Sequence, residues 1–104
     1  MKVQEAYLEV VNDLGLHARA AVKLVVEANK FDSYVMLSRE GTPEVNAKSI
    51  MGVLTLAAGK GSVVKVRCEG DDAEEALEAL RGLFRSGFED ESQAKEKPGT
   101  EAND

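Results

Sequence analysis

Residues 3–29 read VQEAYLEVVNDLGLHARAAVKLVVEAN, and the hydrophobic period changes within this stretch. At its start, apolar residues alternate with polar ones, which is the period of a strand with one buried face. Residues 12–15 interrupt the alternation. Over residues 18–29 the apolar side chains recur at helical spacing, with Lys23 and Glu27 as an ion pair on the polar side. The stretch therefore predicts a strand, a short loop and an amphipathic helix.

The middle of the chain contains three more strand patterns and a short helix. Residues 34–38 predict a second strand and residues 42–47 a third, and Pro43 favours a sheet edge because proline has no backbone N–H to donate. Ser49 opens the short helix, and residues 64–68 alternate as a fourth strand.

The clearest helical pattern lies in the last third of the chain. Asp71 or Asp72 can cap its start, and a glutamate three residues on, Glu74 or Glu75, would complete a capping box. Gly87 ends the helix. The buried stripe of this helix is expected to comprise Ala76, Leu77, Leu80, Leu83 and Phe84.

The order of elements is therefore strand–helix–strand–strand–helix–strand–helix, which predicts an α+β fold. We expect a four-stranded antiparallel sheet with three helices on one face and solvent on the other. This domain would span residues 1–88. Residues 89–104 have few apolar and many acidic side chains, so we expect them to form a disordered tail.

The composition of the 104-residue chain narrows the classes of function. A formal net charge of −6 makes nucleic acid and anionic membranes poor partners, and no apolar run is long enough to span a bilayer. Cys68 is the only cysteine, which excludes an intrachain disulfide and favours a reducing compartment. We therefore expect a single cytoplasmic domain that neither binds nucleic acid nor inserts into a membrane.

The only histidine of the chain lies where the first loop becomes the first helix. The free backbone amides of Ala18, Arg19 and Ala20 at the helix start favour an anion such as phosphate. Gly15 lets the backbone turn sharply, and the Arg19 guanidinium can donate to phosphate oxygens. These features make His17 a candidate phosphoryl acceptor.

A structural role for His17 remains open on these residues alone. A single histidine at a helix start is commonly a capping or surface residue, in which case the chain would be a small ferredoxin-like binding module. His17 has no histidine or cysteine companion to complete a metal site, so neither a metal nor another cofactor is expected. The chain has no recognisable carboxylate pair or catalytic triad, so we do not expect an enzyme.

Two stretches resemble the HPr family, the histidine phosphocarriers of the bacterial phosphoenolpyruvate:sugar phosphotransferase system. Residues 12–21, NDLGLHARAA, resemble the active-site signature of the family. Residues 46–61, NAKSIMGVLTLAAGKG, are similar to its second motif. The resemblance covers residues 1–88 and implies the open-faced sandwich fold of that family.

The resemblance also implies a reaction and its partners. His17 would accept a phosphoryl group on Nδ1 from phosphorylated enzyme I, itself charged by phosphoenolpyruvate, and would pass it to a IIA-type protein. Arg19 would steady the phosphoryl oxygens, and the amides of Ala18, Arg19 and Ala20 would complete the phosphate cradle. The chain would then be a stoichiometric carrier and not an enzyme.

Ser49 has two interpretations. Serine is a favourable N-cap at the start of a short helix, which is a purely structural role. The resemblance implies a second role, in which HPr kinase/phosphorylase phosphorylates Ser49 and so regulates the carrier.

A face for partner docking is expected beside His17. The apolar residues near the two helix starts that could form it are Leu16, Ala20, Ile50, Met51 and Leu54. These residues could instead belong to the core, although the helical phase predicts that Met51 is more exposed than Ile50. The chain is expected to act as a monomer.

Some residues differ from the pattern of the sugar branch of the family. Ala20 stands where many members have proline, and alanine is a good helix former. Leu14 and residues 83–89 look more like the nitrogen-branch paralogue. The resemblance therefore leaves open a regulatory HPr-like protein that signals through its phosphorylation state and does not drive sugar uptake.

Overall fold

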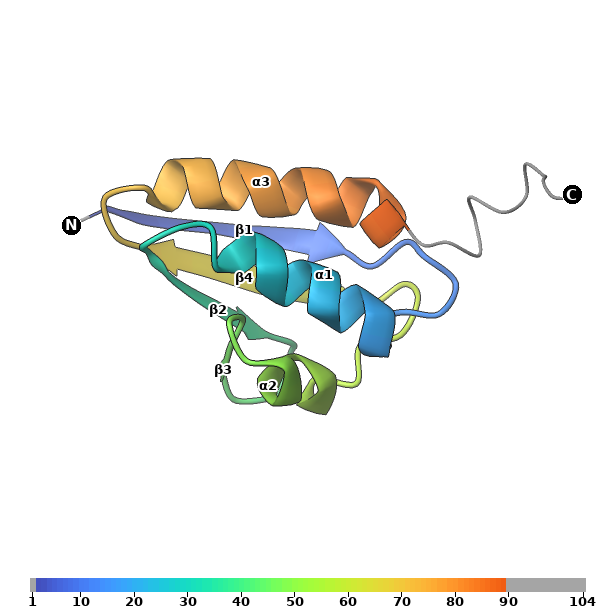
Figure 1. Ribbon diagram of the computed structural model, residues 1–104. Helices are drawn as coiled ribbons and strands as arrows, with labels where there is room; N and C mark the ends of the chain where they lie inside the picture. Colours follow the sequence, from blue (N-terminus) through green and yellow to red (C-terminus); the bar gives the residue numbers. More distant parts are fainter. Residues whose placement is uncertain (1, 90–104) are drawn as a thin grey trace, which may run out of the picture.

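The computed structural model describes residues 2–89, and its elements follow the expected order βαββαβα (Figure 1). The tail predicted for residues 89–104 lies outside the described residues apart from Glu89. The elements are β1 (Val3–Glu9), α1 (Ala18–Ala28), β2 (Tyr34–Ser38), β3 (Val45–Asn46), α2 (Ile50–Thr55), β4 (Val63–Glu69) and α3 (Ala73–Arg85), followed by a short 3-10 turn over Gly87–Glu89.

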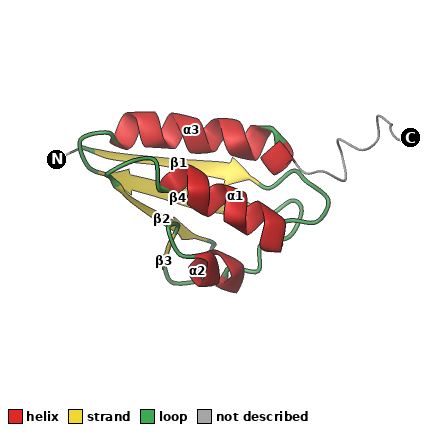
Figure 2. Ribbon diagram, in the orientation of Figure 1, coloured by secondary structure: helices red, strands yellow, loops and turns green. Residues whose placement is uncertain are grey.

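The four strands form one antiparallel sheet in the order β1-β4-β2-β3. β4 lies in its interior, where Val66 pairs with Ala6 of β1 on one side and with Leu37 of β2 on the other. Helices α1 and α3 lie across one face of the sheet, and α2 lies beside α1 near β3 (Figure 2). The prediction of a four-stranded α+β open-faced sandwich is confirmed.

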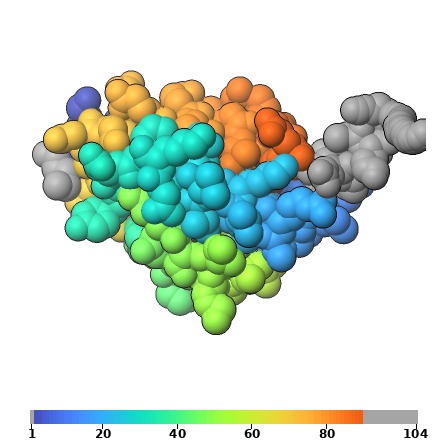
Figure 3. Space-filling model, viewed as in Figure 1, coloured from blue at the N-terminus to red at the C-terminus, as the bar shows by residue number. Residues whose placement is uncertain are grey.

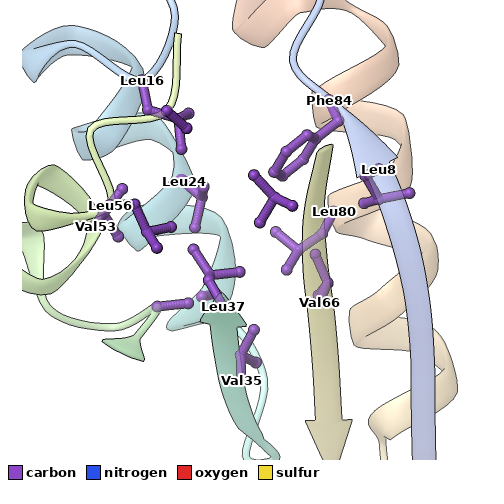
Figure 4. Packing of buried hydrophobic residues seen from close by; sticks show 14 of the residues in the cluster. Leu8, Leu16, Leu24, Val35, Leu37, Val53, Leu56, Val66, Leu80 and Phe84 are labelled. Carbon is purple, nitrogen blue, oxygen red and sulfur yellow. The ribbon is translucent and has the colours of Figure 1, made fainter. Parts of the chain in front are cut away.

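One apolar core fills the space between the sheet and the helices. Leu24 of α1 and Leu80 and Phe84 of α3 pack toward Leu37 and Val66 of the sheet (Figure 4). All five side chains are buried, and burying a side chain of this size contributes about 1.5–3 kcal/mol to stability. The alternating and helical periods therefore identify the residues that hold the two layers together.

The third strand is shorter than the sequence pattern predicts. β3 comprises Val45–Asn46, not residues 42–47. The Arg39 amide donates to the Thr42 hydroxyl at 2.9 Å, and the Thr42 amide donates to the Arg39 carbonyl at 3.0 Å, so this turn already uses the hydrogen-bonding groups of Thr42. Pro43 has no N–H to add to the ladder, and strand pairing begins only after it.

The predicted capping box of α3 is wrong. Asp72 is the N-cap of α3, but its side chain makes no capping hydrogen bond. Its carboxylate accepts hydrogen bonds from the backbone amides of Asp32 and Ser33, both at 2.9 Å, and from the Ser33 hydroxyl. The start of α3 is thereby tied to the segment that leads into β2.

The predicted ion pair between Lys23 and Glu27 is also wrong, because both side chains have other partners. Lys23 Nζ donates to the carbonyl of Phe88 at 3.0 Å and to that of Glu89 at 2.7 Å. Glu27 pairs with Lys30 at 3.2 Å. Lys23 therefore joins α1 to the turn that follows α3.

Candidate functional site

His17 is the N-cap of α1. Its backbone is extended, with φ −79° and ψ −177°, and its carbonyl accepts a hydrogen bond from the Ala21 amide at 2.8 Å. The ring Nδ1 accepts a hydrogen bond from the Arg19 amide at 3.3 Å. A ring nitrogen that accepts a hydrogen bond carries a lone pair and not a proton. Nδ1 of this half-buried ring therefore holds the electron pair that a nucleophile needs, and it faces the helix start.

The loop before His17 is held on its inner side by Asn12. This side chain is fully buried, and its Nδ2 donates to the Gly15 carbonyl at 2.8 Å. The Gly15 amide in turn donates to the Asn12 carbonyl at 3.2 Å. Sequence reasoning missed this role, because asparagine is common in exposed turns and its burial has no local signal.

Gly15 packs directly against the loop that follows α2. Its φ is +67°, and a Cβ at this position would lie 2.5 Å from the Ala58 carbonyl oxygen and 2.8 Å from the Gly59 Cα. The Leu16 amide donates to the same Ala58 carbonyl at 2.8 Å. The two loops lie side by side on the helical face of the molecule (Figure 3). Glycine at position 15 is thus required both by the turn and by a neighbour that is distant in sequence.

The first turn of α1 presents backbone amides that lack partners within the helix. They belong to residues 18–20, and the amide of Arg19 faces Nδ1 of His17. No acidic residue lies in this turn, and the nearby carboxylate of Asp13 pairs with Lys60 at 2.8 Å. The positive end of the helix favours an anion at this position.

Ser49 caps α2 in a similar way. Its backbone is extended, with φ −118° and ψ 120°, and its Oγ accepts a hydrogen bond from the Gly52 amide at 3.1 Å. Its carbonyl accepts from the Val53 amide at 3.0 Å. The predicted capping role of Ser49 is confirmed.

Comparison with known proteins connects these features. Residues 4–86 match the family model described as the PTS HPr component phosphorylation site. The chain belongs to the HPr family. Among HPr proteins, it is 51% identical over 88 residues to phosphocarrier protein HPr from Xylella fastidiosa, which covers 85% of this chain and 98% of that protein.

Two further relatives bear on fold and function. The HPr-like protein Crh from Halalkalibacterium halodurans is 47% identical over 76 residues, or 73% of this chain and 89% of that protein. The crystal structure of HPr from Thermoanaerobacter tengcongensis has a TM-score of 0.80 and 45% identity, covering 84% of this chain and 97% of that one. The chain therefore shares the HPr fold as well as the HPr sequence motifs.

The residues expected to form the docking face divide into two groups. Ile50, Met51 and Leu54 of α2 are 43%, 72% and 38% exposed, and Met51 is the more exposed of the first two, as expected. Leu16 and Ala20 are only 5% and 1% exposed. Their inclusion in the docking face is wrong, because both side chains turn inward from the backbone next to His17 and pack into the core.

Three further observations concern the described residues. Burial raises the pKa of the Cys68 thiol to about 11, so the thiol is protonated at neutral pH and is a poor nucleophile. Within residues 2–89, no group of three or more His, Cys, Asp or Glu side chains is placed to hold a metal ion. No helix in this range is long and apolar enough to cross a membrane.

Proposed function

We propose that the chain is a cytoplasmic phosphocarrier in which His17 Nδ1 accepts a phosphoryl group from phosphorylated enzyme I and delivers it to a IIA-type protein. One observation carries this proposal. Nδ1 accepts a hydrogen bond from the Arg19 amide at 3.3 Å, so the nucleophilic nitrogen faces the amides that can bind the phosphoryl oxygens. Membership of the HPr family supports the choice of partners.

The transfer is an in-line displacement at phosphorus. The lone pair of His17 Nδ1 forms the new N–P bond as the bond between phosphorus and the donor atom of enzyme I breaks, and the electron pair of the broken bond returns to the donor. Nε2 keeps its proton throughout. Delivery to the IIA-type protein is the same displacement with phosphorylated His17 as the donor.

The helix start suits both states of His17. Once Nδ1 is phosphorylated it has no lone pair for the Arg19 amide, and a phosphoryl oxygen in the same direction takes over as acceptor. The start of a helix carries a partial charge of about +0.5, which favours the phosphoryl group there. The guanidinium of Arg19 supplies further charge-assisted donors to the phosphoryl oxygens.

Partners would dock on Ile50, Met51 and Leu54, the exposed apolar side chains of α2. Ser49 would regulate this contact when HPr kinase/phosphorylase phosphorylates it. A phosphoryl group adds about −1.5 to −2 charges. The N-terminus of α2 tolerates that charge. An apolar interface with Met51 would be disfavoured, because the phosphoryl group would have to lose its water when a partner binds.

A regulatory HPr-like role is the second candidate, because the chain is 47% identical to the HPr-like protein Crh as well as 51% identical to HPr, and these identities do not separate the two roles. Such a protein would use the same His17 and Ser49, and its partners alone would differ. We propose a monomer in either role, although Crh from Bacillus subtilis, 44% identical, has been crystallised as a domain-swapped dimer. Light scattering of the purified chain would measure its mass in solution.

The phosphocarrier proposal is tested with phosphoenolpyruvate and purified enzyme I from the sugar and nitrogen branches in parallel. We expect an acid-labile, alkali-stable phosphoryl group on the wild-type chain and none on His17→Ala. Adding a IIA-type protein should discharge the label. A label that persists in His17→Ala, or its absence from the wild-type chain with both enzymes, would refute the proposal.

The Ser49 proposal requires ATP and HPr kinase/phosphorylase in a separate reaction. We expect one phosphate per chain, lost in Ser49→Ala, and slower subsequent transfer from enzyme I. Unchanged transfer after complete phosphorylation of Ser49 would remove the regulatory role while leaving the carrier role intact.

A further inference from the structure

A half-buried arginine supports the loop against which the His17 segment packs. Arg39 directly follows β2, and its Nη1 donates to the carbonyl of Leu56 at 2.8 Å and to that of Ala57 at 3.2 Å. These carbonyls lie at the end of α2, where helical carbonyls lack partners within the helix. The guanidinium supplies the missing donor with a charge-assisted hydrogen bond.

Arg39 acts at a strained position. Ala57 has a φ of +51°, in the left-handed region that residues with a Cβ rarely adopt. Such a conformation persists only when the surrounding structure holds it. The bonds from Arg39 to the carbonyls on either side of this α-carbon hold both of the peptide units that it joins.

The next residue contacts the segment that carries the phosphoryl acceptor. The Ala58 carbonyl accepts the Leu16 amide at 2.8 Å, and it is also the atom nearest to the Cβ that would be added at Gly15. The position of the Ala58 carbonyl therefore sets the position of Leu16, which immediately precedes His17.

We infer that Arg39 is a positioning residue for phosphoryl transfer. It holds the left-handed turn at Ala57, so that the Ala58 carbonyl fixes Leu16 and thereby the His17 ring at the start of α1. Arg39 touches no reacting atom, and the inference rests on the proposed function of His17. Small displacements of a nucleophile are sufficient to slow a reaction that depends on in-line geometry.

The test uses Arg39→Met, which keeps the apolar stem and removes the guanidinium, and Arg39→Lys, which keeps the charge. Arg81→Met is the matched control, because Arg81 lies on α3 and, within residues 2–89, its guanidinium pairs only with Glu78, at 3.4 Å. The measurements are kcat and KM of phosphoryl transfer from enzyme I, hydrogen exchange of the Leu16 amide by NMR, and the free energy of unfolding.

For Arg39→Met we expect kcat to fall about three- to tenfold, with little change in KM and faster exchange of the Leu16 amide. Arg39→Lys should be intermediate, because an ammonium can still reach one carbonyl. Adding Ala57→Gly to Arg39→Met should restore at least half of the loss, because glycine adopts a φ of +51° without strain. Arg81→Met should behave as wild type.

The inference is overturned if Arg39→Met lowers only the free energy of unfolding, with kcat and Leu16 exchange equal to those of Arg81→Met. It is also overturned if the double variant is as impaired as Arg39→Met alone, because the effect would then not pass through Ala57. Failure of the proposed function is a separate result: the wild-type chain would not be phosphorylated, while the exchange rate of the Leu16 amide would still report whether Arg39 holds this segment.

Discussion

Gly15→Ala should lower the free energy of unfolding through two separate costs. An alanine at φ +67° adopts a left-handed backbone, which costs about 1–2 kcal/mol. Its Cβ would lie 2.5 Å from the Ala58 carbonyl oxygen and 2.8 Å from the Gly59 Cα, two backbone atoms that cannot rotate away. Overpacking of this kind costs about 1–3 kcal/mol, so we expect a total loss of about 2–5 kcal/mol.

Gly41→Ala separates the two costs. Gly41 has a φ of +85°, but an added Cβ there would meet no atom within 4 Å, so only the backbone cost of about 1–2 kcal/mol applies. Urea unfolding of both variants beside the wild-type chain, monitored by circular dichroism, measures the difference. A domain of this size has a stability of about 5–15 kcal/mol, so both variants are expected to fold. Equal losses in the two variants would refute the argument that Gly15 is constrained by the loop after α2.

Three further predictions concern other parts of the molecule. Ser49→Ala should cost about 1 kcal/mol of unfolding free energy in urea, because it removes the side-chain cap of α2, while leaving the phosphorylation of His17 unchanged. Hydrogen bonds from Ser33 and from backbone amides lower the pKa of Asp72 in the folded chain below its ordinary 3.8. The ionised carboxylate therefore stabilises the fold above about pH 4, and this stabilisation is lost as the pH falls through the lower pKa of the folded state. Asp72→Asn should therefore lose less stability than wild type between about pH 5 and pH 2 in a series of urea titrations, and an unchanged acid profile would contradict this. Met51→Ala should raise the KM of enzyme I for the carrier about fivefold, which corresponds to a loss of about 1 kcal/mol of binding free energy at the interface. The free energy of unfolding should not change, because the Met51 side chain is 72% exposed.

Local periodicity was sufficient to predict most elements of the fold. The strand β2 coincides with the predicted residues 34–38, and α1 begins at the predicted Ala18. Both depend on the spacing of apolar residues along the chain, which is visible in a single sequence. The candidate site was predicted for the same reason, because His17, Gly15 and Arg19 lie together in the sequence around the start of one helix.

The missed features depend on contacts between segments that are distant in sequence. Asp72 could have capped its own helix, but the segment before β2 offers its carboxylate three donors instead, two backbone amides and the Ser33 hydroxyl. Leu16 and Ala20 lie beside His17 in the chain, yet their side chains point into the core. Neither the depth of a residue nor the partner of a charged side chain is encoded in the local pattern, so sequence reasoning could not resolve them.

The hydrogen bonds from Lys23 to Phe88 and Glu89 have a practical consequence for labelling experiments. Lys23 lies six residues after His17 on α1, a rise of about 9 Å along the helix axis, so the last described residue is held against the helix that begins at His17. The beginning of β1 lies at the opposite end of the sheet from the start of α1 (Figure 1). A fluorophore, affinity handle or fusion partner attached through the amino terminus would thus lie at the far end of the sheet from His17, whereas one joined directly after Glu89 would be attached beside α1.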